Sequence, residues 1–242
     1  MNPEVAFPGQ RSFGLIRPLL MLLHPSKTGL QQFESLMALT NLAQMNDEVR
    51  RHIVKEKGFP LIESLMFDEY DMIKRAATEC MCNMVLCEEV FKMYEKEDAP
   101  TERVKLMTLL AGEEDFEISR AASGALAVLS SSEKVCKQII KLSSYMDVQK
   151  QLLVSDKKEL RHRGAHIAAN MIASNKEIAT KMIESEVLEI LMVFSKDTDP
   201  ETSMIRECAE RALESAVELK LINKTKEKTR VDNSGNNINW NS

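Results

Sequence analysis

The sequence predicts an all-α protein that is built from stacked helical repeats, a right-handed α-solenoid. Five segments with a helical apolar pattern carry a small residue at one shared register, and the spacings between these residues are 42, 45, 42 and 45. Apolar or small residues follow each of them three, four and seven positions later, which defines one face of a helix. The five small residues are Ser35, Ala77, Ala122, Gly164 and Ala209. A period in the low forties is typical of armadillo and HEAT repeats, in which each unit buries its apolar face by stacking on the next.

A shorter apolar helix precedes each of these long helices, and a mixed segment such as 47–57 separates the units. Three helices per unit favour the armadillo class over HEAT. The short helices are predicted over 16–23, 61–66, 104–110, 148–154 and 187–194. One domain of about five armadillo repeats is therefore expected over 15–223, divided near 15–58, 59–100, 101–144, 145–186 and 187–223. Residues 1–14 form a lead segment, and 224–242, rich in Asn and Ser, are expected to be a disordered tail.

Composition narrows the class of protein further. Apolar residues make up 44% of the chain and aromatic residues 5%, with 15 Met, so an aliphatic helical core is expected. The sequence has no apolar run long enough for a membrane span and no secretory signal pattern, and its five cysteines lie on predicted helices. A reduced, intracellular setting follows from this pattern. The net charge of −5 disfavours nucleic-acid binding, so neither nucleic acid nor membrane is an expected partner.

Motifs for enzymatic chemistry are weak in this sequence. Phosphate-binding glycine motifs and the GxSxG nucleophile motif are absent, so we expect no enzyme and no cofactor. His162 and His166 share a predicted helix face with Glu159 at a spacing that zinc uses, but the glutamate of the HExxH motif is missing. The alternative is a pair of solvent-facing or groove-lining histidines, and no metal site is expected. Cys80 and Cys82 are interpreted as core thiols.

A candidate binding groove lies on the exposed side of the long helices. Six positions after the small residues stand Asn41, Asn83 and Asn170, with Val128 and Ser215 completing the series. An amide there can donate to and accept from the backbone of an extended peptide. The alternative is that these asparagines bond only neighbouring loops or water.

The row four positions earlier lines the same predicted groove. It includes Met37, Glu79 and His166, and it contains no tryptophan. Aromatic pockets for lysine stems are therefore absent, which argues against a receptor for basic import peptides and leaves a mixed apolar and polar groove.

Five stretches resemble the C-terminal armadillo region of the UCS-domain myosin chaperones. They are NPEVAFPGQRS (2–12), FESLMALTNLA (33–43), IKRAATECMCNM (73–84), ELRHRGAHIAANM (159–171) and IRECAERALESAVELKLI (205–222). The resemblance runs over nearly all of 2–222. It implies a continuous armadillo superhelix with a client-binding groove, in a cytosolic protein that helps myosin motor domains fold and supports thick-filament and myofibril assembly in muscle.

Members of that family are much longer and begin with a tetratricopeptide domain that recruits a heat-shock chaperone partner. This chain shows no tetratricopeptide pattern and resembles only the last five repeats. We therefore expect a myosin-directed chaperone activity, cytoplasmic and associated with the sarcomere in muscle. The alternative is an armadillo scaffold that joins native partners without chaperone action.

The first repeat suggests one further partner, a second copy of this chain. An apolar face with Leu15, Ile16, Leu19 and Leu23 would normally pack on a preceding repeat. We expect its exposure to favour self-association unless residues 1–14 cover it.

Overall fold

The computed structural model describes residues 12–95 and 102–223. These residues form fourteen α-helices and one short 3-10 helix. In chain order the elements are α2 (Phe13–Leu22), α3 (Gly29–Met45), α4 (Asp47–Lys55), α5 (Gly58–Leu65), α6 (Asp71–Met84), α7 (Glu88–Tyr94), α8 (Glu102–Ala111), α9 (Phe116–Leu129), α10 (Glu133–Ile139), α11 (Tyr145–Leu153), α12 (Lys158–Ser174), α13 (Lys176–Ile183), α14 (Val187–Phe194), η2 (Pro200–Thr202) and α15 (Ser203–Glu218). The predicted lead over 1–14 falls mostly outside the described residues, and the predicted tail over 224–242 falls entirely outside them.

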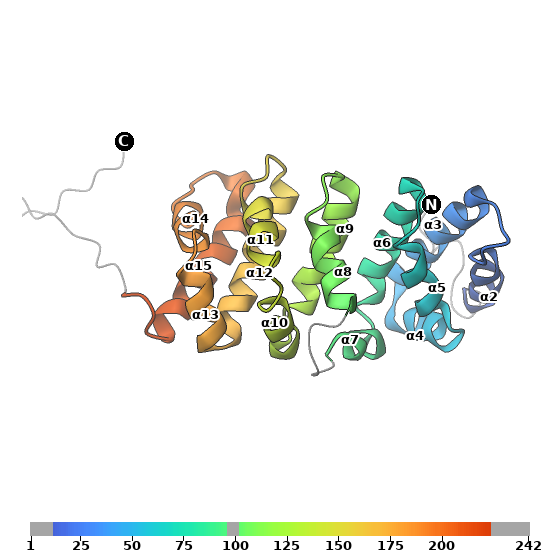
Figure 1. The fold of residues 1–242 in the computed structure, drawn as a ribbon, viewed down its shortest axis with the longest axis horizontal. Coiled ribbons are helices and arrows are strands. Elements are labelled where there is room, and N and C mark those ends of the chain that lie inside the picture. The colour runs from blue at the N-terminus through green and yellow to red at the C-terminus, as the bar shows by residue number, and fades with distance from the viewer. Residues whose placement is uncertain (1–11, 96–101, 224–242) are drawn as a thin grey trace, which may run out of the picture.

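The helices succeed one another along the long axis of the molecule in chain order, from α2 at one end to α15 at the other (Figure 1). The five long helices α3, α6, α9, α12 and α15 pack side by side, each on the next. Two short helices come between consecutive long ones, and α4, α7, α10 and α13 line one edge of the array (Figure 1). The predicted all-α repeat architecture with three helices per unit is confirmed.

The small residues of the shared register lie where the long helices approach their neighbours. All five are buried, as their place on the apolar face requires. Ser35 donates its hydroxyl to the carbonyl of Leu19 at 2.6 Å, which ties α3 to α2. Gly164 is close enough to α11 that an added Cβ would lie 3.1 Å from the backbone nitrogen of Leu153. Small residues at these points therefore set the spacing between neighbouring helices.

Asparagine side chains mark two of the junctions between a long helix and the short helix that follows. Asn46 accepts from the backbone N–H of Val49 at 3.0 Å, and Asn175 accepts from that of Ile178 at 3.0 Å. Each asparagine has an extended backbone, so the chain turns sharply before α4 and before α13. This capping ends the long helix and starts the short helix that follows it in the same repeat.

The first repeat corrects one expectation. Ile16 and Leu23 are buried at 0% and 1% exposure, whereas Leu15 and Leu19 are half-buried. The expectation that all four lie on an open face is wrong for Ile16 and Leu23, because α2 packs on α3 and α4 within its own repeat. Self-association remains a prediction. No helix among the described residues is long and apolar enough to cross a membrane.

Candidate functional site

The outward side of α3, α6, α9, α12 and α15, which we call the long-helix face, carries the residues predicted for the groove. A residue two or six positions after a buried small residue points to this side, since 3.6 residues complete a helical turn. Met37 and Asn41 of α3 are exposed. The others are half-buried, namely Glu79, Asn83, His166 and Asn170. The structure therefore places the predicted residues on one face but gives them different surroundings.

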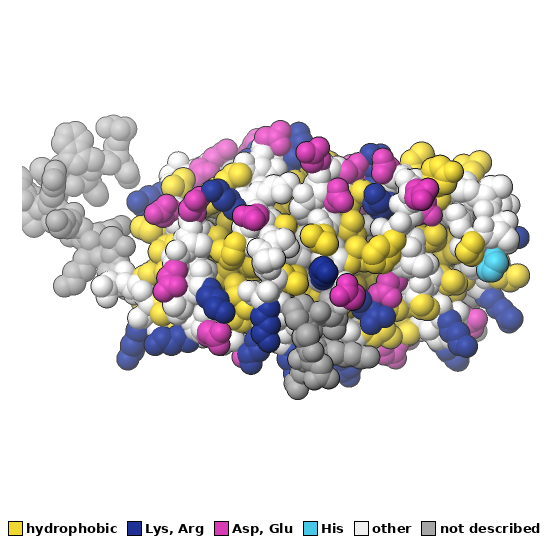
Figure 2. Space-filling view, in the orientation of Figure 1, with side chains coloured by type: hydrophobic (Ala, Val, Ile, Leu, Met, Phe, Trp, Pro, Cys, Tyr) yellow, Lys and Arg dark blue, Asp and Glu magenta, His cyan; other side chains and the backbone are white. Residues whose placement is uncertain are grey.

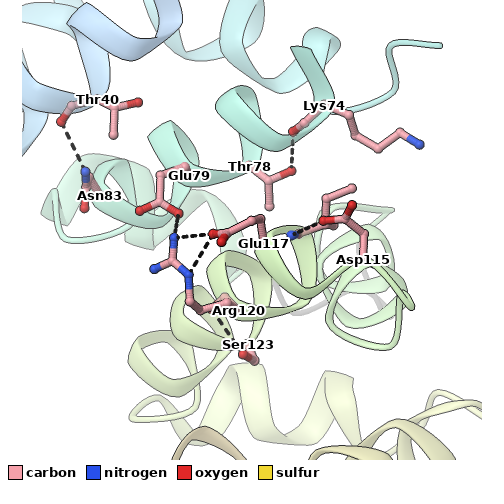
Figure 3. Close-up of polar contacts among 10 residues, drawn as sticks. Thr40, Lys74, Thr78, Glu79, Asn83, Asp115, Glu117, Arg120 and Ser123 are labelled. Atoms are coloured by element: carbon pink, nitrogen blue, oxygen red, sulfur yellow. Dashed lines mark hydrogen bonds and ion pairs between the residues drawn. The ribbon is translucent and has the colours of Figure 1, made fainter. Parts of the chain in front are cut away.

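Asn83 and Asn170 bind the preceding long helix in the same way. The Nδ2 group of Asn83 donates to the carbonyl of Thr40 at 3.2 Å (Figure 3), and that of Asn170 donates to the carbonyl of Ala127 at 3.2 Å. Each bond spans 43 residues, which is one repeat. Both amide donors thus tie consecutive repeats together.

The oxygen atoms of the two amides differ. Oδ1 of Asn170 accepts from Nη2 of Arg211 at 3.1 Å, so α15 is linked to α12 through the same side chain that reaches α9. Among the described residues, Oδ1 of Asn83 has no such partner. Asn41, on α3, makes no hydrogen bond through its side chain within the described part of the chain. Asn41 and the Asn83 oxygen are therefore the amide groups that a bound peptide can reach without breaking an existing bond.

Ion pairs cross the same face between α6 and α9 (Figure 3). Arg120 donates through Nη2 to Glu79 at 2.9 Å and to Glu117 at 2.9 Å. Arg75 pairs with Asp115 through Nε at 2.8 Å, and Asp115 also caps α9 by accepting from the N–H of Ile118 at 3.1 Å. Partial burial favours a higher pKa for the Asp115 carboxyl, but the bonds from Arg75 and Ile118 hold its pKa below the ordinary value. The carboxylate is therefore ionised at neutral pH.

A histidine pair from α12 lies beside a cysteine from α15. The rings of His162 and His166 meet edge to face with centroids 6.2 Å apart. Nδ1 of His166 lies 3.9 Å from Sγ of Cys208. Burial lowers the pKa of His162, helped by the charge of Arg163, so its ring is neutral at physiological pH. Burial, aided by the neighbouring Arg211, His162 and Arg163, lowers the pKa of His166 in the same way.

Exposed apolar side chains occupy the α3 and α6 end of the long-helix face, and Met204 of α15, 61% exposed, stands at the other end. Leu30 is 65% exposed and Met72 is 55% exposed, and each stands five residues before its buried small residue. The first turns of α3 and α6 are in contact, since a Cβ added to Gly29 would lie 3.5 Å from Ile73. Met37, 44% exposed, continues the row along α3. We call Leu30, Met37 and Met72 the apolar row.

The face formed by the short helices has its own distribution of charged and hydrophobic side chains. Figure 2 shows Lys and Arg side chains concentrated along the edge formed by α4, α10 and α13, and Asp and Glu side chains along the opposite edge. Hydrophobic side chains lie between the two edges (Figure 2). Leu109, Val154 and Val193, on or next to short helices, are 48%, 61% and 68% exposed. These three side chains match the apolar row in exposure, so replacing them is a suitable control for replacing the apolar row.

Comparison with known proteins shows which proteins this chain is homologous to. No protein-family model matches the chain. Protein unc-45 homolog B of Xenopus tropicalis is 44% identical over 216 residues, which are 88% of this chain and 23% of that protein. The structure of UNC-45 from Drosophila melanogaster covers 92% of this chain with a TM-score of 0.85 and 42% identity. The chain is a homologue of the UNC-45/UCS family of myosin chaperones.

Two more UNC-45 structures support the relationship. A structure described for the features of the UNC-45 chaperone critical for binding and folding muscle myosin covers 90% of this chain, with a TM-score of 0.82 and 31% identity. The myosin chaperone UNC-45 from C. elegans, in complex with an Hsp90 peptide, covers 89% with a TM-score of 0.77 and 29% identity. The chain spans about a quarter of the length of the UNC-45 proteins that it matches.

A designed armadillo repeat protein in complex with a (KR)4 peptide has a TM-score of 0.72 at 19% identity, over 88% of this chain. At that identity the likeness shows the fold alone. The predicted armadillo class is confirmed, as is the predicted resemblance to the UCS family.

Sequence reasoning missed Cys208 and Arg120 as parts of the long-helix face. Cys208 stands 42 residues after His166 and Arg120 stands 41 residues after Glu79. The small residues of these repeats are 45 apart, so the shared register does not pair them and only the packing of the helices does. Of the two predicted core thiols, Cys80 is buried, whereas Cys82 is partly buried and packs against the core.

Proposed function

We propose that this chain binds partly folded myosin motor domains on its long-helix face and keeps them from aggregating, without ATP. The observation that carries the proposal is the apolar row, which is exposed on the long-helix face of a chain homologous to UNC-45 myosin chaperones. Partly folded proteins expose apolar surface and unpaired backbone, and both promote aggregation. A chaperone that prevents this aggregation must bind both the apolar surface and the unpaired backbone.

The apolar row supplies the partner for client apolar surface. Complete burial of a Leu or Met side chain is worth about 1.5–3 kcal/mol. Leu30, Met37 and Met72 each leave roughly half of the side chain open to a client. Covering all three therefore contributes roughly 2–4 kcal/mol, a contribution suited to reversible holding. Met side chains also adapt to varied surfaces because they are unbranched and polarizable.

The amides supply the partner for client backbone. In this proposal Asn41 both donates to and accepts from an extended segment of the client, and Asn83 accepts through its free oxygen. Asn170 holds α9, α12 and α15 together and contributes by keeping the face rigid. Glu79 and His166 line the path between these amides and give the face its polar character.

The wider setting follows from the same homology. We propose a cytoplasmic protein that supports myosin folding and myofibril assembly. Peptides of Hsp90 and Hsp70 are bound by UNC-45 from C. elegans. We propose that a heat-shock partner is recruited by the tetratricopeptide domain of the longer family proteins and not by these repeats.

The second candidate function is a scaffold that binds native partners. The ion pairs and the inter-repeat hydrogen bonds of the long-helix face favour it, because a rigid polar surface suits recognition of a folded protein. Sedimentation of the chain with native and with heat-stressed myosin motor domain separates the two. A holding protein co-sediments with the stressed form and leaves the native form alone, whereas a scaffold binds a native protein.

A matched pair of variants locates the binding face. The triple variant L30S/M37S/M72S removes the apolar row, and we expect it to weaken binding of stressed motor domain at least about tenfold. The control L109S/V154S/V193S removes three apolar side chains of similar exposure from the short helices, and we expect it to bind like the unaltered chain. Equal loss in both variants would refute the assignment to the long-helix face. Circular dichroism checks that both variants remain helical.

A further inference from the structure

Three metal-binding side chains meet on the long-helix face where the last two repeats join. His162 and His166 stand one turn apart on α12, and Cys208 reaches them from α15. One ligand atom from each lies within 4.8 Å of the ligand atoms of the other two. The closest measured pair is Nδ1 of His166 and Sγ of Cys208, at 3.9 Å. Glu159, the third ligand that the sequence suggested, is exposed and is not part of this group.

We propose that His162, His166 and Cys208 form a zinc site that links α12 to α15, with a water molecule as the fourth ligand. Zinc is bound by imidazole nitrogen and thiolate sulfur, and where it has three protein ligands it keeps one open position. The group contains no carboxylate, and its soft thiolate excludes magnesium and calcium as the natural ion.

The distances suit the ion. Tetrahedral zinc, with bonds of about 2.0–2.1 Å to nitrogen and about 2.3 Å to sulfur, holds its ligand atoms about 3.3–3.6 Å apart. The three atoms must close by up to about 1.5 Å, which rotations of the half-buried imidazoles provide. The two histidines at i and i+4 already face the same side of α12, so no change in the backbone is needed.

Zinc binds imidazole through a neutral ring nitrogen and cysteine as the thiolate, so binding releases the thiol proton. When zinc binds, the S–H bond breaks, its proton passes to the buffer, and the sulfur lone pair forms the bond to zinc. No electron is transferred in this step.

The surrounding charges limit which ions bind. Arg163 is next to His162 in the sequence, and Arg211 stands three residues after Cys208 and bonds Asn170 of α12. They repel a bare dication, and the Cys208 thiolate offsets one of its charges. Glu207, next to Cys208, adds a negative charge nearby. A zinc–thiolate pair is therefore tolerated where a metal bound only by neutral ligands would not be.

The consequence is a link between the fourth and fifth long helices that depends on the metal. Asn170 and Arg211 already join α12 to α15 by one hydrogen bond. A bound zinc ion would add a second, stronger connection at the same junction. Because only the folded chain brings the three ligands together, zinc must stabilise the fold.

Cobalt(II) titration of the metal-free full chain tests the site, because cobalt bound to a thiolate absorbs light whereas zinc is silent. We expect one equivalent of cobalt to give a thiolate-to-cobalt charge-transfer band and tetrahedral visible bands, which zinc then removes because it binds more tightly. C208S should abolish the charge-transfer band, and H162Q and H166Q should each weaken cobalt binding at least tenfold. C82S, which alters a partly buried cysteine on α6, is the control and should keep the full spectrum.

Thermal unfolding supplies a second measurement that does not depend on cobalt. Excess zinc should raise the unfolding midpoint of the unaltered chain and of C82S, but not that of C208S or H162Q. H162Q changes a half-buried side chain, so the test still stands if C208S fails to fold. The proposal is overturned if cobalt gives no charge-transfer band, if the band survives in C208S, or if zinc raises no midpoint.

Discussion

Replacing Gly164 with alanine tests whether the shared register sets the spacing between helices. Gly164 lies inside α12, and an alanine Cβ would meet Cβ of Leu152 at 3.0 Å, the backbone nitrogen of Leu153 at 3.1 Å and the backbone carbon of Leu152 at 3.3 Å. Two of these three atoms belong to the backbone of α11, which cannot rotate away. The carbonyl of Gly164 also accepts a buried hydrogen bond of 2.8 Å from Gln149, and a shift of α11 would stretch it.

The two opposing effects can be estimated. Glycine to alanine in a helix interior gains about 0.8–1.0 kcal/mol from propensity. Overpacking of a tight contact costs about 1–3 kcal/mol, and the upper half of that range applies because backbone must move. G164A should therefore lose about 1–2 kcal/mol, which lowers the melting temperature by roughly 2–8 °C in a chain of this size.

Gly124 of α9 provides the matched control. An alanine Cβ there would meet Sγ of Cys82 at 3.1 Å and Nε of Arg163 at 3.7 Å. Both atoms belong to side chains that can rotate, so most of the propensity gain is kept. G124A should be neutral or raise the stability by up to about 1 kcal/mol.

Circular dichroism during thermal and urea unfolding measures both variants. Helical signal is the right probe, because Trp240, the single tryptophan, lies outside the described residues. The reasoning is refuted if G164A is as stable as the unaltered chain or more stable, or if G124A loses more stability than G164A.

Three further predictions concern the same repeats. N170A should lower the unfolding free energy by about 1–3 kcal/mol, since it removes the bonds to α9 and to Arg211. N41A, the control, should change it by less than about 0.5 kcal/mol. Equal losses in urea titrations would contradict this. Asp115 has a lowered pKa when folded, so its pairing stabilises the fold at neutral pH and is lost as pH falls below about 4. D115N keeps the helix cap and should weaken that acid dependence in pH-dependent melting curves; an unchanged acid dependence would count against the pairing. Burial raises the pKa of Cys80 to about 12 and that of Cys82 to about 11, so alkylation at pH 8, followed by mass spectrometry, should be far slower than for a free thiol.

Much of the fold follows from the sequence because its signals are local and repeat. The small residue and the apolar residues around it recur at each long helix, and each copy confirms the others. Ile16 and Leu23 were misplaced for a related reason. An apolar face on a helix predicts burial, but it does not say whether the covering helix belongs to the same repeat or to the preceding one.

The site was harder to predict because its properties depend on pairs of residues about one repeat apart. Register placed Asn83 and Asn170 on one face, but it could not show that Thr40 and Ala127 already accept their amide protons. A search for metal ligands along one helix found Glu159, which is exposed and does not belong to the group. The third ligand comes from α15, and only the packing of α12 on α15 brings Cys208 to His166.

Light scattering of heated myosin motor domain, with and without this chain, tests the central claim most directly. An unrelated heat-sensitive protein serves as the control client, and L30S/M37S/M72S serves as the control chain. We predict that the unaltered chain suppresses aggregation of the motor domain selectively and that the triple variant suppresses it much less. Equal suppression of both clients, or no suppression of myosin by a correctly folded chain, would contradict the account.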